Sequence, residues 1–231
     1  QKPNETRLDL VQKNAKIMTD VVTQIKEQEY KGILLIVSNP VDIMTQVAME
    51  VSGFPEHRVF GSGTVLDSAR LRYHLGQHLR VDSRSVHAFV IGEHGDSEIA
   101  AWSSANVSGV PLNSFCEMRG HFNHEGNTES IEEQVKNSAY EIIAKKDATY
   151  YGIAMVVKRI CQAIVRDEKS IFPISLRMHG EYALEDVVLS MPAIVGARGI
   201  ETTIPISLDE KEVSRLHESA EMLRETRKEI R

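Results

Sequence analysis

The chain has 231 residues, of which 42% are hydrophobic and 26% are charged, as is usual for a globular protein. Its formal net charge of −6, from 27 basic and 33 acidic residues, disfavours nucleic acid or an anionic membrane as the main partner, because both bind basic patches. No apolar run approaches the roughly 18 residues that would cross a bilayer. The two cysteines, Cys116 and Cys161, lack metal-ligand spacing, so we expect a reducing, cytoplasmic setting with both thiols buried.

The first third of the chain alternates helical and strand patterns. Residues 8–28 carry an apolar residue every three to four positions, which predicts an amphipathic helix. The apolar run 33–37 fits a strand buried on both faces, and after Ser38-Asn39-Pro40 helical spacing resumes over residues 41–51. This order is typical of α/β folds, in which ligands collect at the carboxyl ends of the strands.

The middle of the chain continues with a short strand at 58–60 and a helix at 66–79. Between them, Gly61-Ser62-Gly63 could suggest a phosphate loop, but no lysine follows at the required spacing. Residues 86–91 form an apolar run that stops at a glycine, which predicts one continuous buried strand that enters a tight turn.

The last half is predicted to be a loop, a long helix, a small sheet and a final helix. Residues 119–130 are rich in Gly, His, Asn and Glu, which indicates a surface loop, and 131–165 read as one helix with a kink at Gly152. The predicted antiparallel strands are 171–178, 187–189 and 204–207, and the C-terminal helix runs from 208 to about 230.

One histidine stands between two glycines directly after the predicted strand 86–91, in Gly92-Glu93-His94-Gly95-Asp96. The glycines let a substrate approach the backbone closely, and an imidazole can transfer a proton near neutral pH. Because the chain has nine histidines, His94 indicates catalysis only together with other residues.

The helix at 66–79 offers such residues. Asp67 and Arg70 are three positions apart and share one face, whereas Arg72 points elsewhere. A carboxylate beside His94 would fix its tautomer and favour its charged form, and a guanidinium can hold a planar carboxylate with two parallel hydrogen bonds. The alternative is a surface ion pair of little consequence.

Two further polar residues have open interpretations. Arg7 lies in a polar stretch that is either a loop closing over a substrate or a solvated surface loop. Asn39 either holds a ligand at the end of a strand or caps the helix that begins at Pro40. His74 and His78 are spaced like metal ligands but lack a third partner nearby, so we expect no metal site.

Taken together, five segments resemble the L-lactate dehydrogenase branch of the lactate/malate dehydrogenase family. They are Gln1–Arg7, Val37–Asp42, Gly61–Arg70, Gly92–Asp96 and Ala148–Gly152. The resemblance implies an α/β fold: the C-terminal half of a Rossmann-type parallel sheet over residues 1–62, then an α+β catalytic domain with antiparallel strands over 63–231.

The resemblance implies reversible hydride transfer between NADH and pyruvate, giving L-lactate in the last step of fermentative glycolysis. His94 would be the acid and base, Asp67 would hold its imidazolium, and Arg7 would polarise the substrate carbonyl. The residues implied to contact the substrate are Gln1, Arg7, Asn39, Arg70 and Thr149.

The same resemblance implies where NAD and an activator bind. The residues implied to meet the nicotinamide are Val37, Ser38, Asn39, Ser62 and Ile153. Arg72 and His87 match an anion site at which fructose 1,6-bisphosphate binds across a subunit interface in bacterial relatives, and the family suggests a homotetramer.

Gln1 bears on the choice of substrate. Malate-specific members carry an arginine at this place, and a neutral glutamine would leave the second carboxylate of oxaloacetate unpaired in a desolvated site. This favours pyruvate. The alternatives are malate or another 2-hydroxy acid.

The Gly-x-Gly-x-x-Gly turn of the family's first half is not in this sequence. We therefore expect the 231 residues to be a partial sequence that binds NADH poorly by itself. A further alternative is a catalytically incompetent fragment that acts only in oligomer assembly.

Overall fold

The computed structural model describes residues 7–146 and 149–230, without the side chains of residues 7–9, 139–141, 143 and 146. The helices in this part are α1 (Arg7–Glu27), α2 (Val41–Ser52), α3 (Val65–Leu79), α4 (Leu112–Met118), α5 (His124–Lys146), α6 (Tyr151–Val165) and α7 (Glu210–Lys228). Short 3₁₀ helices lie at Glu56–Arg58, Ser83–Ser85, Trp102–Ser104 and Glu181–Ala183. The strands are β1 (Leu34–Ile36), β2 (Val59–Gly61), β3 (Val86–His87), β4 (Val90–Ile91), β5 (Ile99–Ala100), β6 (Asn106–Val107), β7 (Val110–Pro111), β8 (Ser170–His179), β9 (Glu185–Gly196) and β10 (Gly199–Thr203).

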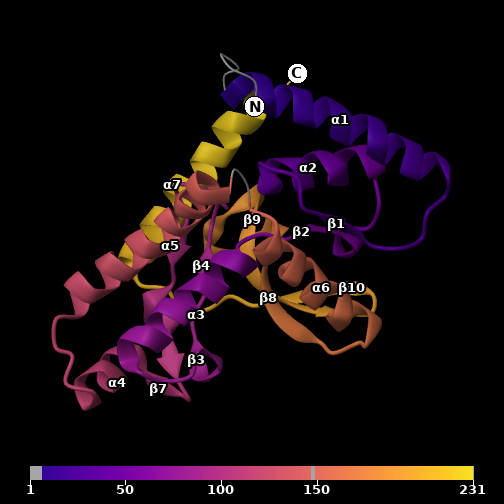
Figure 1. Ribbon diagram of the computed structural model, residues 1–231. Coiled ribbons are helices and arrows are strands. Elements are labelled where there is room, and N and C mark those ends of the chain that lie inside the picture. Colours follow the sequence, from indigo (N-terminus) through magenta and orange to yellow (C-terminus); the bar gives the residue numbers. More distant parts are fainter. Residues whose placement is uncertain (1–6, 147–148, 231) are drawn as a thin grey trace.

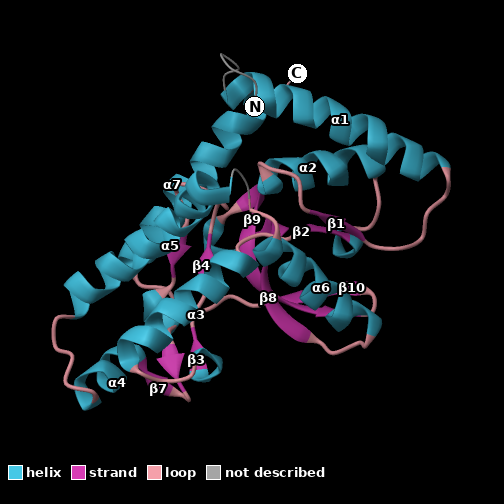
Figure 2. Ribbon diagram, in the orientation of Figure 1, coloured by secondary structure: helices cyan, strands magenta, loops and turns pink. Residues whose placement is uncertain are grey.

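A mixed five-stranded sheet, in the order β1-β2-β8-β9-β10, forms the centre of the molecule (Figures 1 and 2). β1 and β2 are parallel, as a βαβ unit requires, while β8, β9 and β10 follow one another in antiparallel hairpins. The two parts meet where Gly61 of β2 pairs with Ser175 of β8. The predicted α/β fold, with a parallel pair followed by antiparallel strands, is confirmed.

The helices bury their apolar faces in two hydrophobic clusters. The larger cluster packs α2, α6 and α7 against the central sheet, and fully buried Ile174 of β8 belongs to it. The smaller cluster joins α3, α4 and α5 to the short strands, with Ile131 and Val135 of α5 packed inside it. No helix in the described ranges is both long and apolar enough to pass through a membrane.

The prediction of one continuous strand at 86–91 is wrong. β3 pairs with β6 and β4 pairs with β5, so the run divides between two small sheets. Ala88, between β3 and β4, is buried although it belongs to neither strand, so the apolar pattern here reflects burial and not strand pairing. His87 is exposed.

The predicted loop at 119–130 and the single helix at 131–165 are also wrong. α5 begins at His124, where the Thr128 hydroxyl donates to carbonyl groups of the first turn, and α6 is a separate helix that starts at Tyr151. The apolar period continues through both helices, yet α5 packs in the smaller cluster and α6 in the larger. A periodic pattern cannot distinguish these two cases.

Smaller differences concern the last third of the chain. β10 ends at Thr203, before Pro205, so 204–207 is not a strand; Ile204 donates one last hydrogen bond to Pro192. Cys116 is buried as expected, but Cys161 is exposed on α6. α7 begins at a capping box, in which Asp209 and Glu212 each accept the other's backbone N–H.

Candidate active site

The turn that carries His94 lies between β4 and β5 and is fixed from three sides. Gly92 exchanges two backbone hydrogen bonds with Ser190 of β9, at 2.9 and 2.8 Å. The N–H of Glu93 donates to the hydroxyl of Ser219 on α7, and the N–H of His94 donates to the carboxylate of Asp42 on α2 at 2.8 Å. Gly92 has φ +84°, a backbone conformation that suits glycine.

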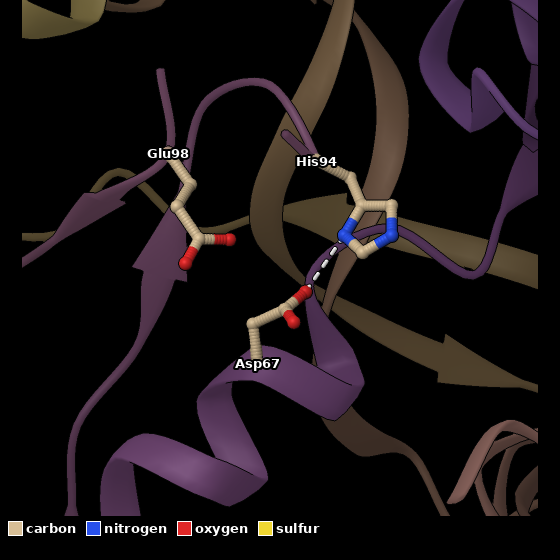
Figure 3. A group of neighbouring side chains, drawn as sticks. All are labelled: Asp67, His94 and Glu98. Carbon is tan, nitrogen blue, oxygen red and sulfur yellow. Dashed lines mark hydrogen bonds and ion pairs between the residues drawn. The ribbon is translucent and has the colours of Figure 1, made fainter. Parts of the chain in front are cut away.

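The structure brings His94, Asp67 and Arg70 together (Figure 3 shows the first two). The His94 Nδ1 atom lies 2.7 Å from Asp67 Oδ2, and Arg70 donates to the other Asp67 oxygen at 3.0 Å. The Asp67 side chain is only 4% exposed, whereas that of His94 is 28% exposed and open to a ligand. The alternative of a solvated surface ion pair therefore does not hold for Asp67 and Arg70.

The electrostatics of this pair favour a charged imidazole. Burial opposes the charge on His94, but the hydrogen bond and negative charge of Asp67 outweigh it and raise the pKa of His94 to about 9. Burial also opposes the charge on Asp67, yet the hydrogen bond and charge of His94, with the charge of Arg70, lower the pKa of that carboxyl. At neutral pH the two groups therefore form an ion pair, and the imidazolium of His94 can donate a proton.

Asp42 is a site residue whose role the sequence analysis missed. It is 2% exposed, and besides the N–H of His94 it accepts the Ser175 hydroxyl at 2.6 Å. Burial raises the pKa of Asp42 to about 6, although Ser175 and the N–H of His94 favour its charged form. A signal was present: Ser175 and Ser190 are polar residues between apolar neighbours in β8 and β9, and a buried hydroxyl needs a partner.

Glu98 was missed as well. It is 5% exposed and faces the pair from the position just before β5 (Figure 3). One carboxylate oxygen of Asp67, one of Glu98 and one ring nitrogen of His94 lie within 4.8 Å of one another. The hydrogen bond between Nδ1 and Asp67 accounts for the close approach of those two groups without an ion. Burial, followed by the charge of Asp67, raises the pKa of Glu98 to about 8.

The carboxyl ends of β1 and β2 form an adjacent polar edge. Val37, Ser38 and Asn39 are exposed there, and the N–H of buried Ser62 donates to Ile36 at 2.8 Å, which aligns the two strand ends. No hydrogen bond from the Asn39 side chain caps α2, whose N-cap is Pro40. In α/β folds, ligands bind at such an exposed edge at the carboxyl ends of parallel strands.

Comparison with known proteins identifies the fold. Residues 1–61 match the lactate/malate dehydrogenase NAD binding domain, and residues 64–231 match the alpha/beta C-terminal domain of the same enzymes. The chain belongs to the lactate/malate dehydrogenase family. NAD is accordingly the cofactor.

Relatives within the family are similar over nearly the whole chain. The L-lactate dehydrogenase of Acetivibrio thermocellus is 48% identical over 225 residues, which cover 97% of this chain and 71% of the relative. L-lactate dehydrogenase 1 of Lactococcus lactis subsp. cremoris is 47% identical, over 97% of this chain and 69% of the relative. The structure of the minor L-lactate dehydrogenase from Enterococcus mundtii, in its ligands-bound form, superposes with a TM-score of 0.95 at 42% identity, over 100% of this chain and 73% of that one.

The remaining predicted residues of this family member have other surroundings or lie outside the described part. Gln1 lies outside the described residues, and of Arg7 only the backbone, at the start of α1, is described. Thr149 is half-buried just before α6, and half-buried Ile153 packs against the larger cluster. Arg72 lines a cavity of about 570 Å³ between α3 and α6.

Proposed function

We propose that the protein is an L-lactate dehydrogenase that interconverts pyruvate and L-lactate with NAD. The observation that carries the proposal is the His94–Asp67 ion pair with Arg70 bound to the same carboxylate. Such a group can give one proton and hold one carboxylate, which are the two tasks that reduction of a 2-keto acid requires.

His94 is the proton donor in this proposal. Its Nδ1 is engaged by Asp67, which leaves Nε2 to give a proton to the 2-keto oxygen, or to take one from the hydroxyl of lactate. NADH supplies the hydride when it is bound. Asp67 stabilises the imidazolium before transfer and keeps the ring in one orientation afterwards.

Arg70 orients the substrate. One of its five N–H groups is bonded to Asp67, and the guanidinium has further donors for two parallel hydrogen bonds to the substrate carboxylate. Within the same proposal, Gln1, Arg7, Asn39 and Thr149 contact the substrate. The residues that we place against the nicotinamide are Val37, Ser38, Asn39, Ser62 and Ile153.

Two larger features belong to the proposal. We place the boundary between the cofactor and catalytic domains at residue 62, where the parallel pair β1-β2 ends and α3 follows. The family resemblance also supports a cytoplasmic homotetramer that works in glycolysis.

Arg72 and His87 form the proposed site for fructose 1,6-bisphosphate. Arg72 is half-buried in the wall of its cavity, and His87 is exposed on β3, so both can reach an anion or a neighbouring subunit. Saturation curves for pyruvate with and without the bisphosphate test the site, with Arg72→Gln as the variant and Arg84→Gln, an exposed surface arginine, as its control. An activation that survives Arg72→Gln excludes the site.

The test of the main proposal is NADH oxidation with pyruvate against oxaloacetate. We expect a large preference for pyruvate. Arg70→Lys should raise KM for both acids, because a lysine cannot form the parallel pair of hydrogen bonds with the carboxylate that they share. A preference for oxaloacetate would identify the malate alternative. Assembly into oligomers without turnover of either acid would identify the structural alternative.

A further inference from the structure

Glu98 is a buried acid next to the active pair that has no established role in the geometry above. It stands at the end of the turn that begins at Gly92, one residue before β5. Its carboxyl group points toward Asp67 and His94 in Figure 3, and no dashed line joins it to either residue. Since the side chain is 5% exposed, water can screen its charge only weakly.

The surroundings of Glu98 contain both signs of charge. Asp67 and Arg70 face it from α3, His94 from its own turn and Lys136 from α5. From α7, Arg215 donates to the backbone carbonyl of Glu98 at 3.4 Å and also pairs with Glu132 of α5. Asp42 of α2 accepts the backbone N–H of His94, and its charge also acts on the imidazole.

Two carboxylates this close and this buried cannot both be charged cheaply, so the pair Asp67 and Glu98 retains a proton while the pH is near neutral. Asp67 is the charged member, because it has the hydrogen bonds from His94 and Arg70, and Glu98 is the neutral one. When Glu98 loses its proton to solvent at higher pH, its new negative charge lies within 4.8 Å of the imidazolium and stabilises it.

We propose that Glu98 is a third member of the His94–Asp67 pair, a positioning residue whose ionisation keeps the imidazole protonated at alkaline pH. This inference rests on the proposed role of His94. It extends that role, because an ionised Glu98 would keep the His94 proton available for reduction of the keto acid well above neutral pH. The raised pKa of His94, to which the charge of Glu98 contributes, agrees with it.

The experiment is an NMR titration of the His94 imidazole in wild type, Glu98→Gln and Glu98→Asp, with the signal assigned by its loss in His94→Gln. Glutamine keeps the size of the side chain and removes its ionisation. We expect the His94 midpoint to fall by about one pH unit in Glu98→Gln and to be largely restored in Glu98→Asp. Glu133→Gln, which removes an exposed carboxylate of α5, is the control and should leave the midpoint within about 0.3 units.

Rates separate an electrostatic role from a structural one. Relative to wild type, pyruvate reduction by Glu98→Gln should fall increasingly as the pH rises above about 8, where Glu98 in wild type becomes charged. A uniform loss at all pH values, or an unchanged His94 midpoint, would overturn the inference. If Glu98→Gln does not fold, the Glu98 carboxyl carbon is titrated by NMR in wild type instead. A midpoint near the usual value of about 4.3 would refute the inference. A shifted His94 midpoint without turnover of pyruvate would refute only the proposed substrate.

Discussion

The negative charge of Asp67 keeps His94 protonated, so Asp67→Asn should remove the acid from the reaction at neutral pH. The pKa of His94 rises from 6.5 to about 9 in the structure, and these 2.5 units correspond to about 3 kcal/mol. Without the charge of Asp67, burial again opposes the charge on His94, while the charges of Asp42 and Glu98 partly offset it, so the pKa should return to about 6.5. At pH 7.5 the protonated fraction of His94 should then fall from about 97% to about 10%.

The assay is the pH dependence of kcat/KM for pyruvate reduction, which reports the free enzyme. We expect its alkaline limb to move by two units or more toward acid, with at least a tenfold loss at pH 7.5. Asp82→Asn is the control, because it removes an aspartate that pairs with Arg84 on the surface. If the limb of Asp67→Asn stays near pH 9, another group holds the proton on His94 and the reasoning fails.

Three further predictions concern stability. The folded-state pKa of Asp42, about 6, lies above its ordinary 3.8, so its ionisation costs stability as pH rises through this window. Relative to wild type, Asp42→Asn should therefore gain roughly 3 kcal/mol in free energy of unfolding between pH 3.5 and 7, and a urea-midpoint difference that does not change with pH would contradict this. Asp209→Ala removes the capping box of α7 and should cost about 1 kcal/mol, measured by thermal unfolding against Glu218→Ala at an exposed position of the same helix. Ile174→Ala, at a fully buried position of β8, should cost about 2–5 kcal/mol, whereas Ile17→Ala on the exposed face of α1 should cost less than about 0.5.

The spacing of apolar residues predicted those elements in which that spacing matches the face that is buried. β1 is an apolar run between polar turns, and α3 has its apolar face at helical spacing, so both were found from sequence. Asp67 and Arg70 were found because they share a helix face, where three positions of spacing imply proximity.

Contacts between segments that are far apart in the sequence leave no pattern in either segment, so the sequence did not predict them. The pairing of Gly61 with Ser175 joins strands more than a hundred residues apart, and the apolar period cannot say that β2 and β8 are neighbours. Asp42 was read only as part of a motif, because its partners His94 and Ser175 follow 52 and 133 residues later. Glu98 carried no signal either, since an acid before an apolar pair reads as solvated until its burial is known.

The long sequence separation between Asp42 and its serine partners has a consequence for synthesis on the ribosome. Asp42 emerges before its partners, because Ser175 and Ser190 follow 133 and 148 positions later. Ser175 emerges with β8, but until β9 has emerged neither the Ser190 hydroxyl nor the backbone partner of Gly92 can be present. The turn therefore reaches its final geometry late in translation, and a nascent chain that stops short of β9 should carry His94 without the contacts to Ser190 and Ser219 that fix its turn.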